Sequence, residues 1–199
     1  MKKKIPGSIW KKTEFGGRLF YLLDLDHPEI EKKIIGEIES GIDVYYDRRW
    51  ELTQGFCEFL FEIPELFINR DILIAGAGIG AESVVIGSMA RKLYINDLAP
   101  VALDYCAMQL DKNGITDFEM LPGRYESIPI PDVDLTVGCF CVYNKESRLG
   151  MQSFFEKSRS PLLLVNDPLS DFKKLLKDME AEGKPLVSDE RFPCFLFEK

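Results

Sequence analysis

The sequence predicts an α/β domain in which helices cover both faces of a mostly parallel sheet of seven strands. From residue 71 onward, short apolar runs alternate with longer amphipathic stretches, a pattern typical of parallel strands joined by helical crossovers. The first run leads into Gly76, Gly78 and Gly80, directly before a predicted helix. The last two runs are joined by too few residues for a helical crossover, which predicts an antiparallel hairpin at the edge of the sheet.

Two parts are predicted along the chain: an N-terminal helical cap over residues 1–48 and a main domain over residues 49–199. Within the cap, Ile30, Ile34 and Ile38 recur at the spacing of one helix face. The strands of the main domain are predicted at residues 72–76, 92–96, 118–121, 133–139, 162–166, 185–189 and 194–199. The helices between them are predicted at residues 81–89, 100–113, 145–157 and 170–182.

Composition and charge limit the classes of partner. The chain of 199 residues has 25 basic and 33 acidic residues and a net charge of −8, which opposes strong sequence-independent binding to nucleic acid or to an anionic membrane. No apolar stretch approaches the roughly 20 residues that cross a bilayer. The five cysteines are scattered and odd in number, and the N-terminus lacks the pattern of a signal peptide. We therefore expect a cytoplasmic protein with a protein or small-molecule partner.

The glycine-rich turn predicts a site for an adenosine-containing cofactor. A strand that ends in G-x-G-x-G and leads into a helix brings bare backbone against a ligand at the carboxyl end of the strand. The next predicted strand ends in Asp97, 21 positions after Gly76. An acid at this place can accept hydrogen bonds from both ribose hydroxyls of an adenosine.

The segment GAGIGA also fits the G-x-G-x-x-A pattern of dinucleotide-binding proteins. Three features weigh against a dinucleotide. Glu82 falls in the first turn of the predicted helix, where its charge repels a diphosphate. The residues beyond Ala81 are taken up by the predicted sheet, which leaves no room among them for a separate catalytic domain. The terminal hairpin also departs from the parallel strands that usually complete a dinucleotide-binding sheet.

Residues 48–199 resemble the class I S-adenosylmethionine-dependent methyltransferases, whose Rossmann-like sheet carries such a glycine-rich loop, an acid and a terminal hairpin. Within this superfamily, the chain is most similar to the seven-strand protein-lysine methyltransferase group, which includes the electron-transfer-flavoprotein beta-subunit lysine methyltransferase. The likeness to this group rests on Trp50 and on the segments IAGAGIGAES, YINDLAP, VGCFCVYNKE and LVNDP.

The resemblance implies a binding site for S-adenosylmethionine. The glycine loop would line the methionine part of the cofactor, Asp97 would hold the ribose and Leu98 would pack against the adenine. Trp50 matches a family tryptophan near the cofactor, and Cys139 stands in the fourth-strand motif where the family has an acid. The implied cofactor-binding residues are Trp50, Gly76, Ala77, Gly78, Gly80, Asp97, Leu98 and Cys139.

Two motifs of this chain depart from the family pattern. In the fourth-strand motif a cysteine, Cys139, replaces the acid, and the tyrosine is displaced to Tyr143. Arg124 stands where an acid commonly contacts the adenine amine. Cys139 and Cys141 are separated by one residue at the end of a predicted strand, and we expect them to point to opposite faces of the sheet. Burial as small apolar residues is the simplest interpretation of both thiols.

The chemistry of methyl transfer can be considered apart from the family. Transfer from a sulfonium is an in-line displacement, so the protein mainly aligns the nucleophile and excludes water. The single histidine, His27, lies outside the predicted sheet, which argues against a histidine-centred hydrolytic mechanism or a metal site. The candidate catalytic residues follow the fourth and fifth strands: Tyr143, Asn144 and Asp167. Asp167 can orient an amine through a charge-assisted hydrogen bond, although an ordinary turn before Pro168 explains it equally well.

Together, these features predict an S-adenosylmethionine-dependent methyltransferase that acts on a nitrogen acceptor, with a protein lysine as the candidate. The expected partner is a protein or small-molecule amine, and neither nucleic acid nor membrane. Two alternatives stay open. One is a dinucleotide-dependent enzyme; the other is a scaffold that binds S-adenosylmethionine without catalysis and regulates a protein partner, which Cys139 and Arg124 favour.

Overall fold

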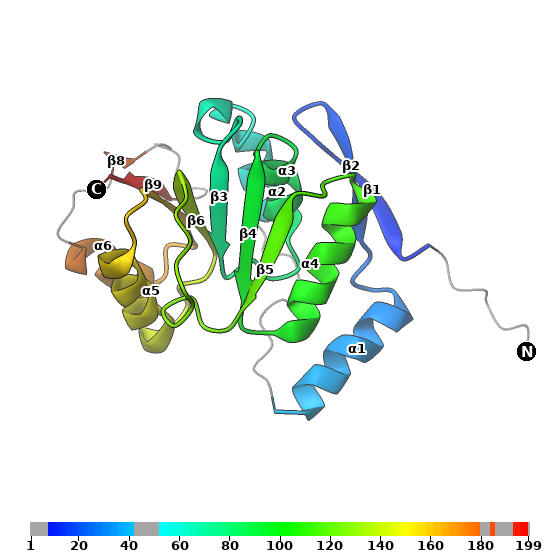
Figure 1. Ribbon diagram of the computed structural model, residues 1–199. Helices are drawn as coiled ribbons and strands as arrows, with labels where there is room; N and C mark the ends of the chain where they lie inside the picture. The colour runs from blue at the N-terminus through cyan, green and yellow to red at the C-terminus, as the bar shows by residue number, and fades with distance from the viewer. Residues whose placement is uncertain (1–7, 42–51, 180–183, 186–192, 199) are drawn as a thin grey trace, which may run out of the picture.

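A seven-stranded sheet forms the centre of the molecule (Figure 1). The computed structural model describes residues 8–41, 52–179, 184–185 and 193–198. The strands lie in the order β5-β4-β3-β6-β7-β9-β8. They are β3 (Asp71–Ala75), β4 (Lys92–Asp97), β5 (Phe118–Pro122), β6 (Leu135–Cys139), β7 (Leu162–Val165), β8 (Lys184–Pro185) and β9 (Cys194–Phe197). The pairs among β3 to β7 are parallel, whereas β9 is antiparallel to both β7 and β8. The predicted sheet and its terminal hairpin are therefore confirmed.

Helices cover both faces of this sheet, as predicted. They are α2 (Thr53–Phe59), α3 (Ala81–Gly87), α4 (Pro100–Lys112), α5 (Lys145–Lys157) and α6 (Ser170–Asp178), with a short 3-10 helix η1 (Pro64–Leu66) before β3. Ile72 and Ile74 pack with residues of α2, α3 and α4, while Leu73 packs with residues of α5 and α6. Successive residues of a strand face opposite sides, so burial on both sides explains why the strands read as continuous apolar runs.

Helix lengths differ slightly from the prediction. Helix α3 ends at Gly87 rather than at residue 89, and α6 ends at Asp178 rather than at residue 182, although residues 180–183 lie outside the described part of the chain. None of the helices in the described ranges is long and apolar enough to cross a bilayer.

The N-terminal part combines a hairpin with the predicted helix. Helix α1 (Pro28–Glu39) buries Ile30 and Ile34, as expected from their spacing, but leaves Ile38 half exposed. Ahead of it, β1 (Trp10–Phe15) and β2 (Arg18–Leu23) form an antiparallel hairpin that the expected helical cap did not include. The turn between the strands is Gly16–Gly17, and both glycines have positive φ, which is the local chemistry of a tight hairpin. The predicted boundary at residue 48 lies outside the described residues.

Two amide side chains, one in α4 and one at its C-cap, attach the hairpin to the main domain. Oε1 of Gln109 accepts a hydrogen bond from the Leu23 N–H at 2.7 Å, and its Nε2 donates to the carbonyl of Ile79 in the glycine loop. Asn113 exchanges two hydrogen bonds, each of 2.8 Å, with the backbone of Tyr21. Gln109 is fully buried, so it links the N-terminal part to the glycine loop through the interior.

Replacing Gln109 with leucine tests this link. Leucine fills a similar volume but leaves the Leu23 N–H and the Ile79 carbonyl without this partner, and an unsatisfied buried polar group costs about 1–3 kcal/mol. We expect urea unfolding to show a loss of stability of that size for Gln109→Leu. The matched control is Gln54→Leu on the exposed surface of α2, which should stay within about 0.5 kcal/mol of the parent chain. Equal stability of the two variants would contradict the structural role of Gln109.

Candidate functional site

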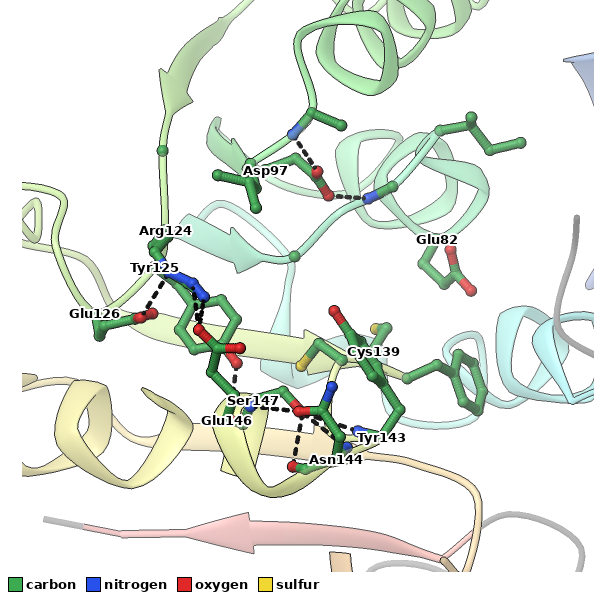
Figure 2. Close-up of a pocket in the computed structure, with 18 of the residues that line it drawn as sticks. Glu82, Asp97, Arg124, Tyr125, Glu126, Cys139, Tyr143, Asn144, Glu146 and Ser147 are labelled. Atoms are coloured by element: carbon green, nitrogen blue, oxygen red, sulfur yellow. Dashed lines mark hydrogen bonds and ion pairs between the residues drawn. The ribbon is translucent and has the colours of Figure 1, made fainter. Parts of the chain in front are cut away.

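A cavity opens at the carboxyl ends of β3, β4, β5 and β6 (Figure 2). The chain runs from β3 outward through β4 to β5 and then returns to the other side of β3 with β6. Such a reversal of strand order leaves a crevice where open α/β sheets bind ligands. The cavity is lined by Thr53, Gly76, Gly78, Ile79, Ala81, Glu82, Asp97, Leu98, Ala99, Gly123, Arg124, Tyr125, Glu126, Cys139, Phe140, Cys141, Tyr143, Asn144, Glu146 and Ser147.

The three glycines of the loop between β3 and α3 all have left-handed backbone, with φ of +69° at Gly76, +54° at Gly78 and +83° at Gly80. A Cβ on Gly76 would lie 2.9 Å from Cβ of Cys141, and one on Gly80 would lie 2.3 Å from Sγ of Cys106. Conformation and packing therefore both require glycine at these two positions. Gly76 and Gly78 line the cavity, whereas Gly80, the N-cap of α3, does not.

Ala77, also expected to line the cofactor, is buried in the core beneath the loop and does not reach the cavity. Trp50 lies outside the described residues.

Asp97 holds the glycine loop and the start of α4 together. Its Oδ2 accepts a hydrogen bond from the Gly78 N–H at 2.7 Å, and its Oδ1 accepts one from the Ala99 N–H at 2.9 Å. Burial raises the pKa of this carboxyl above its ordinary value, although the backbone donors oppose the shift. A carboxylate has about four lone-pair sites, so Asp97 keeps capacity for ligand hydroxyls at the cavity. Leu98 beside it is 53% exposed and lines the cavity too.

Two buried asparagines, which the sequence analysis did not single out, fix the loops on either side. Nδ2 of Asn96 donates to the carbonyls of Leu121 and Gly123, each at 2.7 Å, and so holds the loop after β5. Asn166 accepts from the Val142 N–H and donates to the Val142 carbonyl, each at 2.9 Å. Both asparagines end an apolar strand run, and this polar interruption is the sequence signal that could have identified them.

Cys139 and Cys141 pack on opposite sides of the sheet, as expected: Cys139 lies in the cluster with residues of α2, α3 and α4, and Cys141 in the cluster with residues of α5 and α6. Both also line the cavity. Alternate residues of a regular strand share a face, so this arrangement needs a turn between the two cysteines. Strand β6 ends at Cys139, and Phe140 adopts a left-handed conformation with φ of +51°, which turns the chain. Phe140 is held there by a hydrogen bond of 2.8 Å from its N–H to the Val165 carbonyl. A non-glycine residue in this conformation is strained, and such strain is typical of functional sites.

Both thiols are protonated at neutral pH. Burial raises the pKa of Cys139 and raises that of Cys141 to about 12. Both side chains are buried, as predicted.

The predicted catalytic residues have different surroundings. Tyr143 and Asn144 both line the cavity. Asn144 is also the N-cap of α5, because its Oδ1 accepts from the Ser147 N–H at 2.9 Å while Oγ of Ser147 accepts from the Asn144 N–H at 3.1 Å. Asp167 does not reach the cavity, and its carbonyl accepts hydrogen bonds from Asn166 and Leu169 in the turn after β7.

Arg124 connects the loop after β5 to α5 across the cavity (Figure 2). Its guanidinium donates to Glu146 at 2.9 Å and forms an ion pair with Glu126 at 3.3 Å. Tyr125 adds a second connection, since its hydroxyl donates to the Ser147 carbonyl at 2.8 Å. Among the described residues that line the cavity, Arg124 is the only base, against four acids: Glu82, Asp97, Glu126 and Glu146. The lining is therefore acidic.

No protein-family model matches this sequence, and no curated protein sequence is significantly similar to it. Solved structures share its fold. The T. thermophilus 16S rRNA N2 methyltransferase RsmC, in complex with AdoMet and guanosine, has a TM-score of 0.64 at 15% identity and matches 97% of this chain. The match spans 51% of the length of RsmC.

Two further solved structures are similar to this chain in fold. A putative RNA methyltransferase from Pyrococcus horikoshii has a TM-score of 0.60 at 13% identity, over 85% of this chain and 98% of its own. A ribosomal protein methylase from Lactobacillus delbrueckii subsp. bulgaricus has a TM-score of 0.57 at 12% identity, over 71% of this chain and 79% of its own. The chain therefore has the Rossmann-like methyltransferase fold that the sequence predicted.

A pair of glycine substitutions separates packing from backbone strain in the loop. Gly80→Ala introduces both a left-handed alanine and the overlap with Cys106, whereas Gly17→Ala places alanine at φ of +74° with no atom within 4 Å of the new Cβ. The left-handed backbone alone costs roughly 1–2 kcal/mol, and overpacking adds about 1–3 kcal/mol. In urea unfolding, Gly80→Ala should therefore lose about 1–3 kcal/mol more stability than Gly17→Ala, which is the cost of overpacking. Equal losses would show that the loop has room for a side chain.

Proposed function

We propose that the chain is an S-adenosylmethionine-dependent methyltransferase that acts on a nitrogen acceptor, with the amino group of a protein lysine as the candidate. The observation that carries this proposal is the joint placement of Gly76, Gly78 and Asp97 on one wall of the cavity. Bare backbone and an acid at the ends of adjacent parallel strands are the arrangement that receives an adenosine. The bound cofactor would supply a methyl group already activated on a sulfonium.

The proposed roles follow the positions around the cavity. Asp97, fixed by two backbone donors, offers its remaining lone pairs to the ribose hydroxyls. Leu98 presents an exposed apolar side chain beside it for the adenine. Gly76 and Gly78 leave room for the chain that leads from the ribose towards α3.

The lining favours an amine as the acceptor. An acidic cavity attracts a cationic or polar nitrogen group and repels a phosphate. Tyr143 lies at the end of the cavity formed after β6 and is the side chain we propose to align the acceptor. Asn144 supports Tyr143 by fixing the first turn of α5. Asp167 lies outside the cavity, so it would act on the acceptor only after a movement of the turn that follows β7.

The names of proteins with a similar fold state different methyl acceptors. RsmC and the P. horikoshii protein are described as RNA methyltransferases, and the L. delbrueckii protein as a methylase of a ribosomal protein. For this chain, the net charge of −8 and the acidic lining favour a protein amine over RNA.

The cofactor is tested by isothermal titration with S-adenosylhomocysteine, with NAD as the control ligand. We expect micromolar binding of S-adenosylhomocysteine and none of NAD. Asp97→Ala should weaken that binding by about 1–3 kcal/mol, because ligand hydroxyls lose their acceptor and the Gly78 N–H loses its partner. Asp104→Ala, on the exposed surface of α4, should leave the affinity unchanged. Binding of NAD instead would favour the dinucleotide alternative.

The acceptor is tested by incubating the purified chain with cell lysate and labelled S-adenosylmethionine. We expect label in protein that survives ribonuclease and is lost with protease, and we expect amino-acid analysis to place it on nitrogen. Tyr143→Phe should reduce the rate while leaving the affinity for S-adenosylhomocysteine unchanged, because its proposed role concerns the acceptor. Label that is lost with ribonuclease would identify an RNA acceptor, and cofactor binding without any transfer would favour the scaffold alternative.

A further inference from the structure

The N-terminal hairpin lies at the margin of the molecule beside α4 (Figure 1), and its strand β1 has one uncovered edge. Strand β2 is joined to α4 on its far side, because Gln109 and Asn113 bond to its backbone. Strand β1 (Trp10–Phe15) pairs with β2 alone among the described strands, and none of its residues lines the cavity. An uncovered strand edge is a template for pairing with another strand.

The backbone of Lys12 and Glu14 faces this uncovered edge. Tyr21 directs both its N–H and its carbonyl to Asn113, so its pair with Lys12 is a non-hydrogen-bonded pair of the antiparallel ladder. In such a pair, both residues turn their backbone groups away from each other. Glu14 lies two positions further along β1 and faces the same way, because the pattern alternates. No described residue bonds to the backbone groups that Lys12 and Glu14 present there.

The side chains at these two positions carry opposite charges. Lys12 and Glu14 are both exposed and point to the same face of the hairpin. Within the described ranges, neither forms an ion pair, whereas Lys11 pairs with Asp24 and Asp26. The Lys12 ammonium lies 5.7 Å from the centroid of the Tyr21 ring, a contact that is weak at an exposed site. Lys12 and Glu14 can therefore both pair with charges on another strand.

A second copy of β1 matches this edge in one register. Antiparallel pairing of two identical strands has two-fold symmetry, and the outward backbone groups meet only where both paired residues have even numbers. The candidate registers set Lys12 opposite Lys12, Glu14 opposite Glu14, or Lys12 opposite Glu14. Opposite charges stabilise a cross-strand pair, and like charges destabilise it. The last register is therefore favoured, and it places Thr13 on the two-fold axis.

We propose that the chain forms a two-fold dimer in which the β1 edges of two copies pair antiparallel, with Lys12 of each copy opposite Glu14 of the other. The two hairpins then form one four-stranded sheet in the order β2-β1-β1-β2. Each pair of Lys12 with Glu14 exchanges two backbone hydrogen bonds. The pairing ends at Trp10, whose N–H already donates to Oγ of Ser8 at 3.1 Å. Because this surface lies outside the cavity, the dimer does not depend on the proposed function.

Charge reversal tests the register by sedimentation equilibrium of the full chain over a range of concentrations. Lys12→Glu and Glu14→Lys each set like charges opposite one another at two symmetric places, so either change should raise the dimer dissociation constant about tenfold or more. The double variant Lys12→Glu/Glu14→Lys restores opposite charges and should restore the dimer. Lys32→Glu makes the same change of charge on the exposed surface of α1 and should leave the dissociation constant unchanged.

Three results of this experiment would overturn the proposal. The first is a parent chain that stays monomeric at every concentration. The second is a dimer that survives both single variants, and the third is a double variant that dimerises no better than either of them.

A crosslink tests the position of the axis. Thr13 of the two copies would form a non-hydrogen-bonded pair with Cα atoms about 4.5 Å apart, which suits a disulfide. Mild oxidation should therefore convert Thr13→Cys to a covalent dimer and leave Lys32→Cys a monomer, since the native cysteines are buried. A Thr13→Cys chain that stays monomeric would overturn the two-fold pairing. Crosslinks of Thr13→Cys to other proteins of a lysate, with none between copies, would assign the edge to a foreign strand and overturn it as well.

Discussion

The hydrogen bonds from Gly78 and Ala99 to the carboxylate of Asp97 are the constraint on which the rest of the site depends. They join the loop after β3 to the loop after β4 at the edge of the sheet. The left-handed glycines give the first loop its shape, and Cys106 and Cys141 pack against it so closely that no Cβ fits at Gly80 or Gly76. Desolvation raises the pKa of this carboxyl, and the backbone donors oppose that shift, so the two hydrogen bonds favour the charged form of the acid at the cavity.

Buried amide side chains extend this order to the surrounding loops. Gln109 joins the glycine loop to the N-terminal hairpin, Asn96 holds the loop after β5, and Asn166 holds the chain after β6. Gln109 and Asn166 donate and accept at once, whereas Asn96 donates twice, and each of these side chains satisfies backbone groups from segments that are distant in sequence. The N-terminal part thereby supports the glycine loop at the wall of the cavity and also covers α4.

Periodicity predicted most of the fold, because the strands from β3 to β7 are buried on both faces and the helices between them carry a regular apolar face. The hairpin at residues 10–23 was missed because its burial is completed by α4: Gln109 contacts Leu23 across 86 positions of sequence. In the site, Gly76, Gly78, Asp97, Leu98 and Cys139 were placed at the cavity by their order after the strands. The left-handed turn at Phe140 was not predicted, since the packing of Val165 and Phe56 around it is a property of the folded chain. Asp167 and Ala77 do not line the cavity, since a position after a strand does not fix the direction of a side chain.

The two ends of the cavity are built in different ways, and this difference has a functional consequence. The wall at Asp97 is held by buried backbone hydrogen bonds, whose loss leaves unsatisfied groups and is costly. The connection from Arg124 to Glu146 is an ion pair between side chains that are 40% and 74% exposed, and exposed pairs of this kind contribute little to stability. The ion pair from Arg124 to Glu146 therefore contributes less to stability than the hydrogen bonds that hold the glycine loop. Under the proposed function, the wall that would hold the ribose is thus fixed more firmly than this ion pair holds the opposite wall.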